Sequence, residues 1–195
     1  MLSVGLPLEQ ALRDERRGLV DAGPEIAELD DEAKGRRDEL ATARSRVEDL
    51  SEAFDEILRR FTLPWLQSAE VDQQTYLPVV NGRSLRDLSS GGMKTTTNVA
   101  YYLAVFVTAL RDQEILLPSF LMLDSIRKAS GTGKEDLARS ERIYAYLQTL
   151  QELRRPPNPL PRDFQLIVVD NDMPHQFESH FNTIRIDIQN PLIRS

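Results

Sequence analysis

Two serines and two glycines stand directly before a long apolar segment and are the residues best suited to bind an anion. Ser89, Ser90, Gly91 and Gly92 precede the apolar residues 99–110. The first backbone N–H groups of a helix have no partner within the helix, and glycine lets a ligand approach the backbone closely. A serine at this place is also a common helix cap, so a capped helix without a ligand is the alternative. The stretch predicts a helix start that can donate hydrogen bonds to an anion.

Two aspartates end short apolar runs. Residues 120–124 read Phe-Leu-Met-Leu-Asp and residues 165–170 read Gln-Leu-Ile-Val-Val-Asp, so that Asp124 and Asp170 come last. Short continuous apolar runs are typical of buried parallel strands, and such sheets bind ligands at the carboxyl ends of their strands. A carboxylate there can hold Mg²⁺, directly or through water, and it can equally cap the following turn. Asp124 and Asp170 are therefore candidate metal ligands.

An α/β lobe over residues 63–195 has to position these groups. In chain order the pattern predicts an edge strand over 75–80 containing Pro78, a turn at Asn81-Gly82, a buried helix over about 92–110, strands over 120–124 and 165–170 with a helix over about 135–153 between them, and a final strand over 183–188 that closes the sheet. The serine–glycine turn then opens the buried helix, and the aspartates end the two apolar strands.

A heptad seam precedes the lobe and predicts a coiled-coil arm over residues 1–62. Alternating steps of three and four are apolar at all but two slots, which are Leu8, Leu12, Glu15, Leu19, Ala22, Ile26, Leu29, Ala33, Arg36, Leu40, Ala43, Val47, Leu50, Phe54, Ile57 and Phe61. Gly23-Pro24 predicts a kink or the restart of a second helix. The alternative is a helical hairpin that folds on itself. No later segment matches the seam in length, so its partner is another copy of this chain or a different polypeptide segment.

The composition excludes several kinds of site. The 195 residues are 41% hydrophobic and 28% charged, as in globular proteins with a charged helical arm, and they include no cysteine that could ligate metal or act as a nucleophile. A net charge of −7 argues against a nucleic-acid clamp formed by this chain alone. The N-terminus shows no basic leader, and the apolar run 99–107 is too short to span a bilayer. We therefore expect a cytoplasmic protein without a membrane partner.

The order of these features resembles the C-terminal half of the ATPase head in the structural-maintenance-of-chromosomes (SMC) and SbcC-type family. Residues 90–95 resemble the ABC signature, with Met93 where the family usually has Glu or Gln, and Ser89 is the alternative register for the signature serine. Residues 120–124 resemble the Walker B strand, and residues 166–171 resemble the strand that enters the switch loop. The resemblance covers nearly the whole chain and is weakest before Ile26.

The resemblance implies a fold and a mechanism. The fold is the C-terminal lobe of an ABC-type, P-loop ATPase head that carries a coiled-coil helix. Two such heads sandwich two ATP molecules, and the signature turn of one head contacts the γ-phosphate of ATP held by the P-loop of the other. Residues 89–92 would then bind nucleotide in trans, and Asp124 would position Mg²⁺. Head-to-head dimers of this family serve DNA repair, chromosome organisation or antiviral defence, with DNA as an indirect partner.

No Walker A motif is present in the sequence. Residues 131–134 (Gly-Thr-Gly-Lys) imitate its end, but Lys128 stands where the first glycine belongs, and Glu135 replaces the Mg²⁺-binding Ser or Thr. In the family, the P-loop and the mate of the coiled coil both lie in the N-terminal half. The chain therefore looks like one half of a split or truncated ATPase, and its partner would be an N-terminal half with the P-loop.

Two catalytic positions also depart from the family pattern. Ser125 stands where the family has a catalytic Glu, and serine is not an unassisted general base at neutral pH. Asn171 stands where the family has the switch histidine, and its amide can orient a water or a phosphate oxygen but carries no proton. Hydrolysis is then either slow or dependent on another carboxylate, such as Asp170 or Asp172.

Two other functions are compatible with the sequence. Asp170-Asn171-Asp172 resembles the Asp-x-Asp of Toprim-type nucleases, in which clustered carboxylates hold two Mg²⁺ ions, although Asp124 only partly replaces the glutamate of such sites. A coiled-coil scaffold with a degenerate head that does not hydrolyse ATP is the second, and Ser125 and Asn171 favour it.

Overall fold

The computed structural model describes residues 5–127, 133–152, 160–170 and 173–184. The chain divides into two compact units, Met1–Arg46 and Val47–Ser195. The second unit begins earlier than the boundary expected after residue 62, because the last turns of the first helix belong to it. The fold is mixed α/β. Among the helices within the described ranges, none is both long and apolar enough to cross a membrane.

The first unit consists of most of helix α1, Gly5–Arg60. The helix continues through Pro24 without ending, so no second helix begins there. Four large apolar side chains of the heptad seam, Leu12, Ile26, Leu29 and Leu40, are 57–60% exposed. The apolar seam of this unit is therefore open to a partner. A coiled-coil mate stays a prediction.

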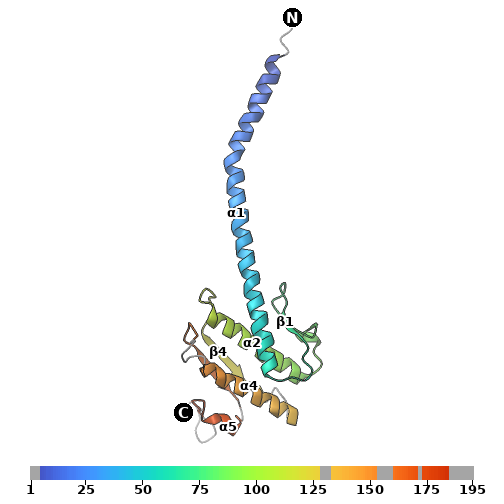
Figure 1. Cartoon of the computed structure of the whole chain (residues 1–195), viewed down its shortest axis with the longest axis vertical. Helices are drawn as coiled ribbons and strands as arrows, with labels where there is room; N and C mark the ends of the chain where they lie inside the picture. The colour runs from blue at the N-terminus through green and yellow to red at the C-terminus, as the bar shows by residue number, and fades with distance from the viewer. Residues whose placement is uncertain (1–4, 128–132, 153–159, 171–172, 185–195) are drawn as a thin grey trace, which may run out of the picture. The chain divides into compact units, whose positions relative to one another are not determined.

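The last turns of α1 lie in the core of the second unit. Phe54, Ile57, Leu58 and Phe61 are at most 1% exposed. Figure 1 shows three elements gathered around this end of the helix: α2 (Gly91–Arg111), α4 (Lys134–Glu152) and β1 (Ala69–Val71). Several of these residues are slots of the same heptad seam. The final residues of the seam therefore fill the hydrophobic core of the second unit, whereas large apolar residues earlier in the seam are exposed.

Helix α1 is terminated by a left-handed residue and a cap from another helix. Thr62 has a φ of 52°, the conformation that commonly ends helices. Arg142 Nη1 donates to the carbonyl oxygens of Phe61 and Thr62, at 3.0 Å each. The Arg60 guanidinium lies 5.8 Å from the centre of the Tyr146 ring. Helix α4, Lys134–Glu152, therefore holds the end of α1 by polar and aromatic contacts.

A three-stranded antiparallel sheet follows, with β1 (Ala69–Val71), β2 (Pro78–Val80) and β3 (Arg83–Ser84) in the order β1-β2-β3. The prediction of an edge strand over residues 75–80 is wrong, because β2 is the central strand of this sheet. Pro78 is its first residue and pairs with Val71, whereas β3 pairs only with the two following valines. The proline thus lies beyond the reach of β3, and its missing N–H leaves no gap in that ladder.

The turn between β2 and β3 is the one expected from Asn81-Gly82. Both residues have positive φ, 51° and 70°, which is the backbone of a two-residue type I′ hairpin turn. The Asn81 side chain also accepts hydrogen bonds from the backbone N–H groups of Gln67 and Ser68 and donates to the Trp65 carbonyl. The turn therefore anchors the segment that leads from α1 into β1.

Two of the remaining helices, α2 and α4, agree with the expected positions, and the short η1 and α5 were not expected. A short 3₁₀ helix, η1 (Leu85–Asp87), leads to α2 (Gly91–Arg111), whose middle is buried almost all round. Helix α4 matches the helix expected over about 135–153. A four-residue helix, α5 (His175–Glu178), comes after the last strand.

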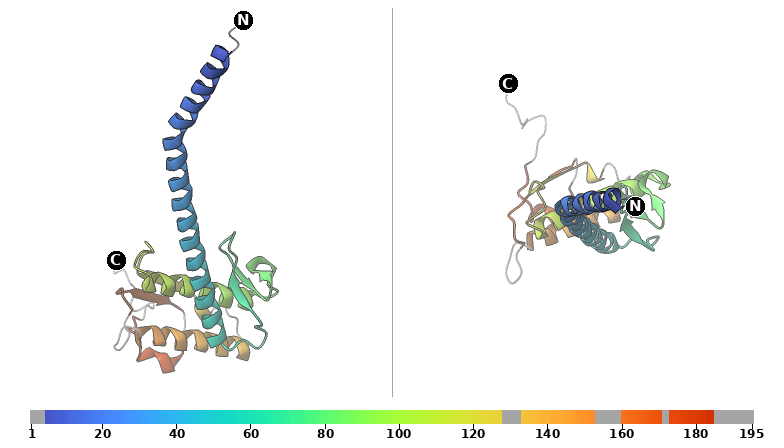
Figure 2. Two further views of the ribbon diagram at one scale, coloured as in Figure 1. Left: turned by 45° about the horizontal axis from the view of Figure 1, so that its top comes forward. Right: turned by 90° about the horizontal axis from the view of Figure 1, so that it is seen from above.

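A second sheet pairs β4 (Phe120–Asp124) with β5 (Gln165–Val169) in parallel. The parallel pairing is confirmed, but the expected burial holds for one face only. Leu123 is buried, whereas Phe120, Met122 and Val169 are 45–53% exposed. The views in Figure 2 place this sheet and the three-stranded sheet on opposite sides of the end of α1. Of the final strand expected over 183–188, residues 183 and 184 are not in a strand, and the rest lies outside the described residues.

Tyr146 gives the second unit a dependence on alkaline pH. Burial raises the pKa of Tyr146 to about 12, against about 10 in an unfolded chain. The stabilisation from the neutral phenol is complete below pH 10 and is lost as the pH rises from about 10 through 12. We expect the urea midpoint to fall between pH 9 and pH 11.5, and to fall less in Tyr146→Phe. Equal losses in both proteins would contradict the assignment to Tyr146.

Candidate functional site

Helix α2 starts at the serine–glycine turn and is capped by Ser90. Ser90 has an extended backbone (φ −123°, ψ 149°), and its Oγ accepts the N–H of Met93 at 3.1 Å. The Ser90 carbonyl accepts the N–H of Lys94, also at 3.1 Å. The helix start expected from the sequence is confirmed. The serine hydroxyl already acts as an ordinary cap, so any ligand has to use the remaining donors.

Those donors are the N–H groups of Gly91 and Gly92. Neither has a hydrogen-bond acceptor within the part of the chain that the structure describes. A side chain placed on Gly91 would meet no atom within 4 Å, so open space faces this backbone. Ser89 is exposed, and its Oγ lies 3.7 Å from the Met93 sulfur. The turn therefore presents two unused donors at the positive end of a 21-residue helix.

Asp124 and Ser125 lie at the carboxyl end of β4. Ser125 has a φ of 57°, a left-handed backbone that is unfavourable for a residue with a side chain. Its N–H donates to the Val169 carbonyl at 2.7 Å, and its Oγ donates to Asp124 Oδ1 at 2.8 Å. Asp124 itself is exposed. The Asp124 carboxylate therefore faces solvent, where it can reach a hydrated cation.

Asp170 follows β5 at the same edge of the sheet, since Asp124 pairs with Val169. Its Oδ2 accepts the backbone N–H of Arg127 and the hydroxyl of Tyr144, at 2.9 Å each. Asn171 and Asp172 lie outside the described residues. The structure thus brings three of the predicted groups, Asp124, Ser125 and Asp170, to one edge.

Within the described residues, no hydrogen bond or ion pair joins residues 89–92 to Asp124, Ser125 or Asp170. Across the described ranges, no group of three or more His, Asp or Glu side chains is arranged to hold a metal ion. A Mg²⁺ ion that keeps most of its waters and is shared with phosphates needs only one or two carboxylates, so Asp124 stays a candidate ligand.

The segment that imitates a Walker A end has a different role at its described residues. The Gly133 N–H donates to Asp136 Oδ2 at 3.3 Å, and Asp136 Oδ1 accepts from Arg139. The Gly133 N–H is therefore already used by a carboxylate of the chain itself. Lys134 is the first residue of α4, and residues 131 and 132 lie outside the described residues.

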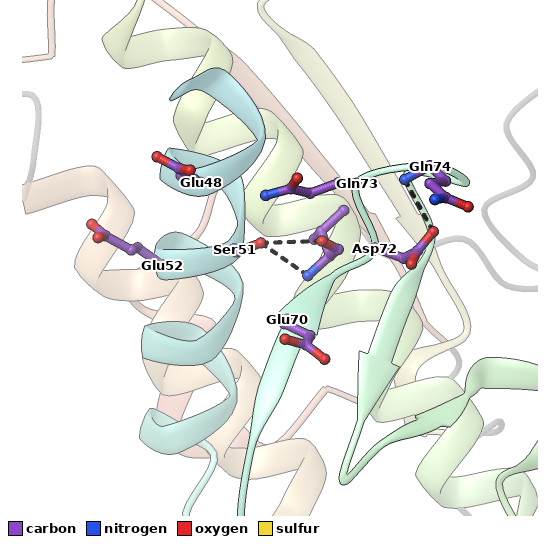
Figure 3. Close-up of a pocket in the computed structure, with 8 residues that line it drawn as sticks. Glu48, Ser51, Glu52, Glu70, Asp72, Gln73 and Gln74 are labelled. Atoms are coloured by element: carbon purple, nitrogen blue, oxygen red, sulfur yellow. Dashed lines mark hydrogen bonds between the residues drawn. The ribbon is translucent and has the colours of Figure 1, made fainter. Parts of the chain in front are cut away.

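A cavity that sequence reasoning missed lies between α1 and β1 (Figure 3). It has a volume of about 640 Å³ and is lined by Glu48, Ser51, Glu52, Glu70, Val71, Asp72, Gln73 and Gln74. The Ser51 Oγ accepts the Val71 N–H at 2.9 Å and ties the strand to the helix. Only the four-residue spacing of Glu48 and Glu52 is visible in the sequence, and it does not reveal that β1 lies beside them.

The cavity is lined by several acidic side chains, and the sequence predicted no reaction or ligand for them. Hydrogen bonds from Thr75 and Gln74 hold the pKa of Asp72 below its usual range. None of the residues that line the cavity belongs to the site expected from the sequence.

Comparison with known proteins assigns no family: no family model matches the chain, and no curated protein matches it.

Proposed function

We propose that the chain is the C-terminal lobe of an SMC/SbcC-like ATPase head, which completes an ATP site held by a P-loop-bearing N-terminal half. The observation that carries the proposal is the start of α2, where Ser90 caps the helix and the Gly91 and Gly92 N–H groups are left open. Backbone donors at a helix N-terminus suit a multiply charged phosphate. The lobe would thus act in trans on a nucleotide bound elsewhere.

The exposed face of the β4–β5 sheet supports the view that the chain is one half of a head. Phe120, Met122 and Val169 leave apolar surface in solvent on strands whose composition is typical of buried positions. Covering this face with the elements of an N-terminal half would remove that surface from water. The exposed heptad side chains of the first unit suit a helical mate from the same half.

The proposed roles follow from the geometry of each group. The Gly91 and Gly92 N–H groups would donate to the terminal phosphate of ATP, and the hydroxyl of Ser90 would keep the helix start in place. Asp124 would hold Mg²⁺ through its waters, and that ion supplies charge neutralisation of the phosphates when bound. Ser125 cannot act as an unassisted base, so we expect nucleotide-dependent association with slow hydrolysis.

Two alternatives are weighed by the same contacts. A Toprim-like nuclease needs converging carboxylates, and the described Asp170 instead accepts from Arg127 and Tyr144. The scaffold without hydrolysis is favoured by Ser125, which replaces the catalytic carboxylate. Besides lacking hydrolysis, this scaffold differs from the proposed ATPase lobe in that its association does not depend on nucleotide.

Nucleotide-dependent association tests the proposal. The chain is mixed with a polypeptide that carries a P-loop and a matching heptad helix, sought first in the reading frame directly upstream. Addition of ATP and Mg²⁺ should double the mass of the complex in light scattering. Ser90→Arg should abolish this doubling, because the long side chain fills the open space at the turn and removes the cap.

The exposed Gln113, beyond the far end of α2, provides a matched control, and Gln113→Arg should associate like the wild type. Association of Ser90→Arg at the wild-type level would refute the signature role. Association without ATP would favour the scaffold.

A further inference from the structure

One oxygen of the Asp170 carboxylate, Oδ2, is already committed to the fold of the site. Both lone pairs of Oδ2 are used, by the Arg127 N–H and the Tyr144 hydroxyl. We propose that Asp170 is a positioning residue that fixes the backbone after Asp124, and that it is neither a general base nor a metal ligand. The proposal rests on the proposed function, because it concerns a carboxylate at the same sheet edge as Asp124, the Mg²⁺ ligand proposed there.

The backbone after Asp124 needs such an anchor. Ser125 holds a left-handed conformation that is unfavourable for a residue with a side chain. Such a conformation persists only where neighbouring contacts enforce it. The Ser125 N–H donates to the Val169 carbonyl, and two residues later the Arg127 N–H donates to Asp170. Two bonds to the end of β5 therefore bracket the strained residue and set the direction in which the chain leaves Asp124.

Tyr144 fixes the orientation of the Asp170 carboxylate. Its side chain is completely buried on α4 and stacks on Phe177, with ring centres 5.8 Å apart and an interplanar angle of 22°. A phenol held in this way offers its hydroxyl in one direction only. Asp170 is thus oriented by a rigid donor on one side and presents its oxygen to the Arg127 backbone on the other.

Substitution of Asp170 by Asn and by Ala separates positioning from chemistry. Asparagine keeps an oxygen that can accept both hydrogen bonds but lacks the negative charge that a base or a Mg²⁺ ligand needs. Alanine removes the acceptor as well. If Asp170 positions the backbone, Asp170→Asn should behave nearly like the wild type and Asp170→Ala should not.

The first readout is amide hydrogen exchange at Arg127 in the full chain without nucleotide. Loss of a hydrogen bond to a charged acceptor corresponds to about 10- to 100-fold faster exchange. We expect this acceleration in Asp170→Ala and less than about threefold in Asp170→Asn. Exchange at core amides of α2 serves as the internal reference for folding. Unchanged exchange in Asp170→Ala, or equal acceleration in both variants, would overturn the proposal.

The second readout is the Mg²⁺ concentration that half-saturates nucleotide-dependent association with the P-loop partner. Asp170→Asn should keep the wild-type midpoint, whereas a midpoint raised about tenfold or more in Asp170→Asn would show a metal ligand instead. If Asp170→Ala fails to fold, Tyr144→Phe takes its place, with an expected acceleration of about 3- to 10-fold at Arg127. Failure of the wild type to associate would count against the proposed function alone, since the exchange experiment needs no nucleotide.

Discussion

A chain that begins at Val47 should fold like the second unit of the full protein, and a chain that begins at Leu63 should not fold. The two differ only in residues 47–62, the last turns of α1 and the residues just beyond them. Far-ultraviolet circular dichroism and thermal unfolding of the two purified chains measure the difference. The expected result is a cooperative transition for the longer chain and none for the shorter one.

The physical reason is the apolar surface that those turns bury. Phe54, Ile57, Leu58 and Phe61 are each at most 1% exposed, and full burial of such a side chain contributes about 1.5–3 kcal/mol. Their loss removes about 6–12 kcal/mol in total, which equals the whole stability of a typical domain, about 5–15 kcal/mol. The shorter chain also loses the carbonyl of Phe61 that Arg142 caps.

The opposite outcome would be equally clear. Cooperative unfolding of the chain from Leu63 would place the folding boundary after residue 62, as the sequence pattern suggested. Addition of a peptide covering residues 47–62 to the shorter chain is the matched control, because it restores the buried side chains without restoring the connection. Recovery of a cooperative transition with this peptide would show that the missing packing caused the loss.

Local features of the fold were predictable because each depends on a few neighbouring residues. The Ser90 cap, the left-handed Asn81-Gly82 turn and the limits of α2 and α4 follow from local backbone chemistry. These local features need no knowledge of what packs against them. The parallel pairing of the two apolar runs joins distant segments, and it was predictable because short continuous apolar runs are typical of parallel strands.

Features that depend on tertiary placement were not predictable. A heptad seam looks the same whether its mate is a separate helix or the core of the same unit, so nothing distinguished the role of Leu40 from that of Phe54. Pro78 suggested an edge strand, because proline has no N–H to donate to a neighbouring strand. The sequence does not show that β3 pairs only with the two residues after Pro78, which lets β2 be the central strand.

The same limit applies to the candidate site. The sequence offered Asp124 and Asp170 as equivalent ends of two strands. In the structure, Tyr144, from the middle of α4, and the backbone of Arg127 both donate to Asp170, whereas Asp124 is exposed and accepts from the neighbouring Ser125 hydroxyl. A contact between residues 144 and 170 leaves no periodic signal in the sequence. The position of each aspartate could be predicted, but not that Asp170 accepts hydrogen bonds from α4 and from the chain after β4 while Asp124 is exposed.

Phe54→Ala should destabilise the second unit by about 3–5 kcal/mol, the usual cost of truncating a buried phenylalanine. The Phe54 ring is fully buried and meets Tyr101 edge to face, with centres 6.1 Å apart, so truncation leaves a cavity and breaks an aromatic pair. Urea unfolding followed by the fluorescence of Trp65, the single tryptophan, measures the change within this unit.

Tyr102→Ala is the matched control for this prediction, because it also truncates an aromatic side chain on a helix, but one that is 55% exposed. It should lower the free energy of unfolding by about 1 kcal/mol or less. The centre of its ring lies 5.7 Å from that of Tyr101, but the ring fills no space in the core. Equal losses in the two variants would mean that the end of α1 packs no more tightly than the surface. A large loss of stability in Phe54→Ala alone would show that the last turns of α1 belong to the hydrophobic core and contribute to the free energy of unfolding of the second unit.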